Sequence, residues 1–307
     1  MTRFLMTIAL VLATGATGVR SQTPADVRAP LRIHVVAVDR AGNPVTDLKP
    51  DEFEVWVNIF QVPIQTVTAV SPVSERPRTI VLLLDDMAID AAMGLRVKEV
   101  ARRFVTKMGP DDEMAVMSLN GGGTKITGDR TQLIRIIDRY NAGHGGFLPF
   151  DAVGQHVLRT ITAITRQFSE VTGAKTIVGI GAAWLFDMPV QPASVGRDVR
   201  TEWVEAMRAM SFANASLYVV DPGGVGASPV TASGTSGFAR ETGGHSFGHT
   251  NDTNAVVDRI LRETANYYVL DVADPPIGRK AELRELDVRV KRRGVSIRVK
   301  QWIPGVR

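Results

Sequence analysis

Continuous apolar runs alternate with amphipathic segments through the middle of the chain. Apolar runs of this length are typical of strands that are buried on both faces of a parallel sheet, and apolar residues at helical spacing predict helices between them. Strands separated by helices predict right-handed crossovers and a doubly wound α/β sheet. We assign residues 77–265 to this α/β domain. The predicted strands are 79–84, 113–119, 175–180 and 215–221, and the predicted helices are 91–108, 129–140, 151–168, 198–213 and 254–265.

The two ends of the chain have the shorter pattern of half-buried strands. In the stretch 283–290, Leu286, Val288 and Val290 alternate with charged residues, so one face is expected to be buried and the other wet. An isolated hairpin is marginally stable. We therefore expect residues 22–76 and 266–307 to build one additional β-subdomain from the N- and C-terminal segments. Its predicted strands are 31–38, 65–70, 266–272, 283–290 and 295–303, the last two joined as a hairpin by a basic turn at 291–294.

The first residues have the pattern of a secretory signal. Arg3 is followed by an apolar, alanine-rich stretch to residue 19, and small residues offer cleavage points after it. The alternative is a retained membrane anchor, but the run is short and interrupted by glycine. We expect residues 1–21 to be a signal peptide, the mature chain to start between about residues 16 and 22, and no membrane span to remain after its removal.

Composition fits export. The chain has no cysteine, so disulfides and thiolate chemistry are excluded, and its formal charge of +4 is modest. Removal of residues 1–21 would take away Arg3 and Arg20 and no acid, which leaves about +2. We expect a secreted or periplasmic protein.

Three acidic residues follow the predicted strand 79–84. Asp85 and Asp86 come directly after it, and Asp90 stands where a helix is expected to begin, as a candidate N-cap. In open α/β sheets, ligands bind outside the carboxyl ends of the strands. These carboxylates are therefore candidate site residues.

Two motifs point to a known family. Residues 42–55 read Gly-Asn-Pro-Val-Thr-Asp-Leu-Lys-Pro-Asp-Glu-Phe-Glu-Val, and residues 267–270 read Tyr-Tyr-Val-Leu ahead of the basic turn. With the strand that ends at Asp85, they resemble the secreted bacterial VWFA-related branch of the von Willebrand factor A family. The resemblance implies a von Willebrand A-like sheet with a metal site made by three loops. It also implies an Asp-Gly turn where Asn58 stands here, so an irregular hairpin is expected.

The metal site that the resemblance implies is degenerate in this sequence. Its first loop should read Asp-x-Ser-x-Ser, but only Asp85 is present, and Met87 and Ile89 replace the serines. Phe147 stands where the second loop should have Thr, and Gly181-Ala-Ala183 stands where the third should have Asp. A hard divalent cation needs about six oxygen ligands. We expect neither a metal nor another cofactor.

The replacements make the implied crevice apolar. Besides Met87, Ile89 and Phe147, the aromatic residues Trp184 and Phe186 follow the third core strand. Such side chains either pack beneath the loops or form a patch that binds a partner. The predicted ligand-binding set is Asp85, Asp86, Met87, Ile89, Phe147, Trp184 and Phe186.

These features predict a secreted, non-catalytic protein-interaction module, with another protein as the partner at the face around Asp85. No Gly-x-Ser-x-Gly motif or phosphate-binding loop is present. The alternative is a metal-dependent adhesin or a hydrolase that uses Asp85, Asp86 and either Asp187 or Asp221. A histidine pair, His245 and His249, is expected in a solvated loop.

The C-terminal stretch is basic. Residues 279–307 have ten Lys and Arg residues against three acids. We interpret them as a solvated strand face that opposes edge-to-edge aggregation. Without interleaved aromatic residues, no nucleic-acid partner is expected.

Overall fold

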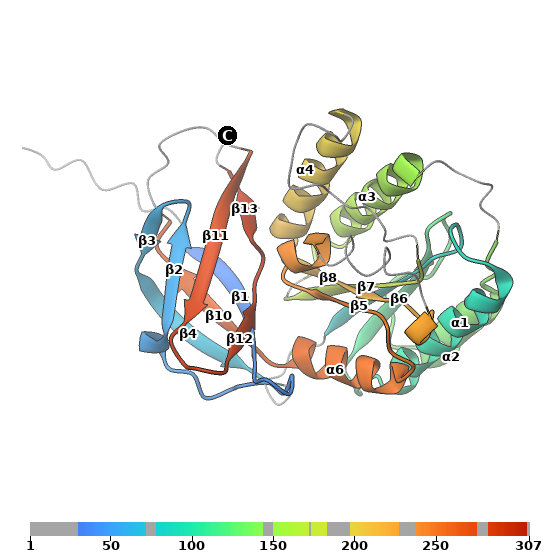
Figure 1. Ribbon diagram of the computed structural model, residues 1–307, viewed down its shortest axis with the longest axis horizontal. Helices are drawn as coiled ribbons and strands as arrows, with labels where there is room; N and C mark the ends of the chain where they lie inside the picture. Colours follow the sequence, from blue (N-terminus) through green and yellow to red (C-terminus); the bar gives the residue numbers. More distant parts are fainter. Residues whose placement is uncertain are drawn as a thin grey trace, which may run out of the picture.

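The computed structural model describes residues 30–71, 78–143, 150–171, 173–182, 197–226, 237–274 and 282–305. An α/β domain and a β-sandwich lie side by side (Figure 1). The predicted signal peptide, residues 1–21, lies outside the described residues. Within the described part, no helix is long and apolar enough to cross a bilayer.

The α/β domain contains a five-stranded, all-parallel sheet in the order β6-β5-β7-β8-β9. The chain moves from β5 to β6 on one side and then returns to place β7 on the other side of β5. The order of the strands therefore reverses between β5 and β7, which is where ligand crevices form in such sheets. The predicted mixed α/β architecture is confirmed. The strands are β5 (Thr79–Leu84), β6 (Glu113–Ser118), β7 (Lys175–Ile180), β8 (Ala215–Val220) and β9 (His245–Phe247).

Helices cover both faces of this sheet (Figure 1). One face packs against α1 (Ala91–Thr106), α2 (Arg130–Arg139) and α6 (Thr253–Ala265), and the other against α3 (Phe150–Gln167) and α4 (Arg197–Phe212). The five predicted helices end within two residues of these bounds. Asp90 caps α1 as predicted, since its carboxylate accepts the N–H of Met93 at 2.7 Å.

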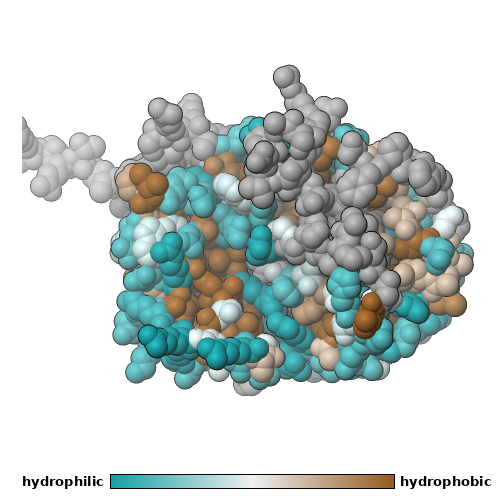
Figure 2. Space-filling view, viewed as in Figure 1, coloured by the Kyte–Doolittle hydropathy of each residue, from teal (hydrophilic) through white to brown (hydrophobic). Residues whose placement is uncertain are grey.

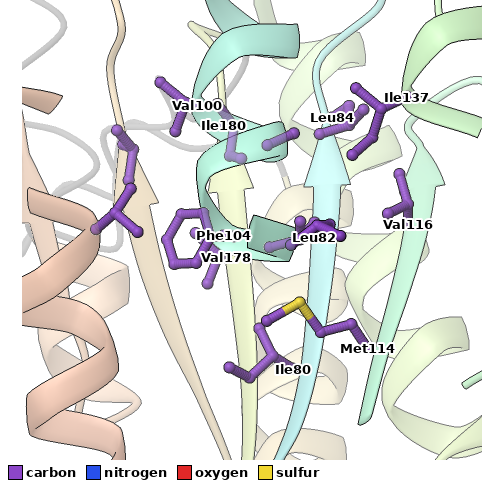
Figure 3. Close-up of a cluster of buried hydrophobic side chains, with 14 of the residues drawn as sticks. Ile80, Leu82, Leu84, Val100, Phe104, Met114, Val116, Ile137, Val178 and Ile180 are labelled. Carbon is purple, nitrogen blue, oxygen red and sulfur yellow. The ribbon is translucent and has the colours of Figure 1, made fainter. Parts of the chain in front are cut away.

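Strand β5 is the centre of the α/β core, and all six of its residues are buried. Ile80, Leu82 and Leu84 point toward α1, where they meet Val100 and Phe104 (Figure 3). The alternate residues belong to the opposite core cluster, under α3 and α4. Burial on both faces explains the continuous apolar run, because each large side chain stabilises the fold by about 2 kcal/mol.

The sandwich consists of two antiparallel sheets, β12-β1-β10-β4 and β13-β11-β2-β3. Each sheet combines strands from both ends of the described chain: β1 pairs with β10 in one, and β11 pairs with β2 in the other. Apolar side chains from both sheets, including Ile33, Val55 and Leu270, fill the space between them. The strands are β1 (Leu31–Val38), β2 (Phe53–Val57), β3 (Phe60–Val62), β4 (Ile64–Val70), β10 (Tyr267–Val272), β11 (Leu283–Val290), β12 (Ser296–Arg298) and β13 (Trp302–Pro304), with a 3-10 turn at Pro50–Glu52.

The predicted hairpin of residues 283–303 is wrong. After β11, the chain crosses to the other sheet, where β12 pairs with β1, and then returns as β13 to pair with the start of β11. Gly294, with a φ of +78°, lies in the turn that redirects the chain. The irregular β2–β3 hairpin is wrong too. Val57 pairs with Phe60 in regular register, because Asn58 adopts the left-handed conformation at φ 53°.

The interpretation of the basic C-terminal stretch as a solvated face holds for the exposed Arg289, Lys291 and Arg293 but needs correction for the others that the structure describes. Arg284 is buried and pairs with Asp274 at 2.6 Å. Arg292 pairs with Asp47 and Glu52, which joins the last strands to the start of the chain. The Lys300 ammonium donates to the carbonyl of Ser211 at the end of α4, and burial lowers its pKa to about 8.

A buried ion cluster connects the two bodies. Glu263 on α6 is fully buried, and its Oε1 accepts from Arg259 Nε at 2.9 Å and from Arg298 Nη2 of β12 at 3.0 Å. The Tyr218 hydroxyl on β8 donates to Oε2 at 3.3 Å. Burial, followed by the nearby Glu263 charge, raises the pKa of Tyr218. The Glu263 carboxylate is therefore one of the connections between the α/β domain and the sandwich, together with the hydrogen bond from Lys300 to Ser211.

Candidate functional site

Asp85 lies at the carboxyl end of β5, beside the point where the strand order reverses. Its side chain is completely buried. Oδ1 accepts the backbone N–H groups of Met87 at 3.0 Å and Ala88 at 2.9 Å, and Oδ2 accepts the N–H of Ala182 at 2.8 Å. Both carboxylate oxygens are thus engaged by the loops that follow β5 and β7.

Gly181 makes this close approach possible. It follows β7 with a φ of +139°, and a Cβ at this position would lie 2.2 Å from the Cβ of Asp85. Real Cβ atoms do not approach so closely, and the backbone angle itself favours glycine. The third loop therefore presents its Ala182 N–H to Asp85 where the family resemblance implies a second carboxylate.

Two further hydrogen bonds fix this edge of the sheet. The Tyr140 hydroxyl donates to the backbone carbonyl of Asp85. Burial, with smaller contributions from the charges of Asp85 and Asp86, raises the pKa of Tyr140, so it remains a neutral donor at neutral pH. Oδ1 of Asp86 accepts the N–H of Asn120 at 3.0 Å, which ties the loop after β6 to the same place.

The two described apolar replacements are part of the core. Met87 and Ile89 are both 8% exposed, and they lie in different clusters, Met87 with the α3 and α4 face and Ile89 with the α1 face. For these two residues, the structure favours packing beneath the loops, one of the two alternatives that the sequence left open. Both side chains pack beneath the loops, where each fills the core on one of the two opposite faces of the sheet.

The remaining predicted site residues cannot be placed with them. Phe147, Trp184, Phe186 and Asp187 lie outside the described residues. Their proposed roles stay predictions from the sequence.

Asp221, the remaining described carboxylate of the alternative metal or hydrolytic site, also accepts a backbone N–H group of its loop. Asp221 follows β8, and its Oδ1 accepts the N–H of Gly223 at 2.7 Å. Within the described residues, no group of three or more acidic or histidine side chains is arranged to hold a metal ion. His245 lies half-buried in β9 with its ring against Phe247, so its expected place in a solvated loop was wrong.

Exposed apolar side chains flank this edge, and the sequence did not single them out. Leu95 on α1 is 68% exposed, and Val225, in the turn after β8, is 67% exposed. The guanidinium of Arg96 donates to the carbonyls of Pro222 and Gly223, so the second turn of α1 is fixed against the β8 loop. Leu95 lies within the predicted helix 91–108, but it does not belong to the buried stripe of α1. It lies two residues before Val97, which is outside the three- and four-residue spacing of the buried stripe.

Comparison with known proteins gives only distant similarities. An aerotolerance-related membrane protein from Bacteroides fragilis is 14% identical, with a TM-score of 0.45 over 61% of this chain and 98% of that one. The pilus adhesin SpaC from Lactobacillus rhamnosus is 8% identical, with a TM-score of 0.46 over 88% of this chain and 48% of that one. The PilB minor pilin from Streptococcus sanguinis is 10% identical, with a TM-score of 0.40 over 63% of each chain.

No model of a known protein family matches the sequence, and no curated protein does. The solved structures are too distant to carry an inference about function. The resemblance to the VWFA-related family therefore rests on the sequence motifs, and the α/β architecture rests on the sheet order and the helices on its two faces.

Proposed function

We propose that this chain is a secreted or periplasmic, non-catalytic protein-interaction module of the von Willebrand A type, whose partner binds at the edge of the sheet around Asp85 without a metal. The observation that supports the proposal best is the carboxylate of Asp85, with three backbone N–H groups on its two oxygens. In this proposal Asp85 fixes the conformation of the loops after β5 and β7, and the outer surface of these loops binds the partner.

The geometry also argues against a chemical role for this carboxylate. Coordination of a cation would compete at Oδ1 with the hydrogen bonds from Met87 and Ala88 and at Oδ2 with the one from Ala182. A buried donor left unsatisfied costs about 1–3 kcal/mol. Asp86 and Asp221 likewise accept loop N–H groups. The acids at this edge therefore stabilise loop conformations.

The exposed residues of the rim provide the contact surface in this proposal. Leu95 and Val225 stand on elements that Arg96 joins, so they can act together as one apolar patch. Phe147, Trp184 and Phe186, predicted on the same edge, would extend the patch. Apolar and aromatic side chains of this kind dominate the buried centres of protein interfaces.

The test is partner binding by a variant with both exposed rim residues changed, Leu95→Glu with Val225→Glu. Partners from the envelope of the source organism are captured on the purified chain, identified, and then titrated as purified proteins. We expect the variant to bind its partner at least about tenfold more weakly, because two carboxylates enter the apolar centre of the interface. Chelators are expected to leave binding unchanged.

Phe212→Glu is the matched control. Phe212 is as exposed as Leu95, but it ends α4 and so lies at the amino-terminal edge of the sheet, away from Asp85. Binding that survives the double rim change but is lost in the Phe212 variant, or that disappears with a chelator, would contradict the proposal.

A further inference from the structure

The β-sandwich has an unpaired strand edge where β11 and β12, which belong to different sheets, diverge. β13 pairs only with residues 283–285 of β11, and the N–H of Leu286 donates to the carbonyl of Gln301 at 2.8 Å. In the part of the chain that the structure describes, no strand pairs with residues 287–290 on the side away from β2. The reason can be followed in Figure 1: after β11 the chain crosses to the other sheet, where β12 pairs with β1.

The backbone of β11 is oriented to extend the sheet at this place. Hydrogen-bonding groups alternate from side to side along a strand. Because the N–H of Leu286 points toward Gln301, the N–H and C=O groups of Val288 and Val290 point to the same, open side. Unpaired strand edges of this kind are templates for another extended chain.

An apolar floor lies beside this edge. A cleft of about 610 Å³ is lined by residues of β11 and β12 and by the neighbouring loops of the α/β domain. Its floor includes Leu286, Val288, Ile297 and Val299, which also contact or form the sandwich core. Figure 2 shows hydrophobic atoms gathered on this face of the sandwich and bordered by hydrophilic ones.

Two arginines stand at the ends of the cleft. Arg40 lies beside Gly294 in the turn between β11 and β12, and Arg240 precedes Glu241, whose carbonyl accepts the N–H of Gln301. Both are exposed, and neither forms an ion pair with another described residue. The cleft therefore has an exposed cation at each end, although the charge of Arg240 also acts on the neighbouring Glu241 carboxylate.

Most other charged side chains that line the cleft already form ion pairs or hydrogen bonds within the molecule. Arg259 and Arg298 share the buried Glu263, and Asp287 pairs with Arg289. Asp39 accepts N–H groups of its own turn, which leaves Glu285 as the free acid of the lining. Burial, followed by the charges of Arg298 and Arg259, lowers the pKa of His245 to about 4, so its ring is neutral at neutral pH.

We propose that this cleft binds an extended segment of a partner protein as an additional strand beside residues 287–290 of β11, with alternate apolar side chains on the floor and acidic side chains at Arg40 and Arg240. The unpaired edge supplies main-chain hydrogen bonds, the floor selects apolar residues at every second position, and the arginines select carboxylates at the ends. This surface is separate from the edge around Asp85.

A synthetic peptide tests the proposal directly. The probe is acetyl-Glu-Val-Thr-Val-Thr-Val-Glu-amide, titrated against the full mature chain, with amide hydrogen exchange measured on the same complex. We expect saturable binding and slower exchange of the Val288 and Val290 amides. Arg40→Glu with Arg240→Glu should weaken binding about tenfold, because two attractive contacts become repulsive.

Matched controls separate strand addition from general charge attraction. Arg135→Glu with Arg139→Glu changes two exposed arginines on α2 and should leave the affinity unchanged. The same peptide with N-methyl groups on its three central residues cannot form the ladder and should not bind. Equal binding of the methylated peptide, no protection of β11, or pairing of this edge with a second copy of the chain in sedimentation experiments would overturn the proposal.

Discussion

Replacing Asp85 with alanine is expected to lower the free energy of unfolding by about 3–5 kcal/mol, because three backbone N–H groups, one buried and two partly buried, lose their acceptor. The groups belong to Met87, Ala88 and Ala182, so the loops after β5 and β7 lose their connection together. Water entering the space would recover part of the loss, which keeps the expected value below the sum of three unsatisfied donors. Denaturant unfolding, followed by fluorescence and by circular dichroism, measures the change.

Asp90→Ala is the control for this experiment. Asp90 lies five residues further on and accepts one N–H, from Met93, at the exposed start of α1. Loss of such a cap costs about 1 kcal/mol. If Asp85→Ala cost no more than Asp90→Ala, the carboxylate would not be the structural acceptor described above.

Replacing Glu263 with alanine is expected to cost about 3–5 kcal/mol as well, because it leaves the largely buried Arg298 and the partly exposed Arg259 without their counter-charge. Arg298 and Arg259 would lose their shared carboxylate, and the Tyr218 hydroxyl would lose its acceptor. Since Arg298 belongs to the sandwich and Glu263 to the α/β domain, we expect the sandwich to lose protection from hydrogen exchange as well.

The matched control is Glu205→Ala, which removes a carboxylate that also pairs with two arginines, Arg166 and Arg208, but on the exposed surface of α4. Exposed pairs contribute about 0–1 kcal/mol. Similar losses for the two variants would show that burial of the Glu263 cluster does not matter to stability.

Much of the α/β domain could be predicted from the sequence, because its signals are local. The strand 79–84 is apolar at every position since both of its faces are covered, and α1 begins where Asp90 offers a cap. The position of Asp85 at a strand end also followed from the pattern. These features depend on periodicity and on capping, which neighbouring residues determine.

The rest depends on contacts between distant segments. Nothing near residues 295–303 shows that β12 pairs with β1, because that pairing joins residues more than 250 positions apart. Likewise, Gly181 looks like an ordinary loop glycine until the Asp85 side chain is seen against it. Loss of the serines at Met87 and Ile89 suggested an altered crevice, but only the three-dimensional structure shows each residue filling a different face of the core.

The central claim is that Asp85 is a structural acceptor and that the face around it works without a metal. Its most direct test is thermal unfolding of the mature chain with millimolar magnesium, manganese or calcium, and with a chelator, together with calorimetric titration of each ion. A ligand present at 100 times its Kd stabilises the native state by about 2.7 kcal/mol, so even a site with a Kd near 10 μM would be visible at about 1 mM ion. We predict no shift in Tm, no binding heat, and no gain in Met87→Ser. A melting transition that moves on chelation and is restored by one of these ions would contradict the account.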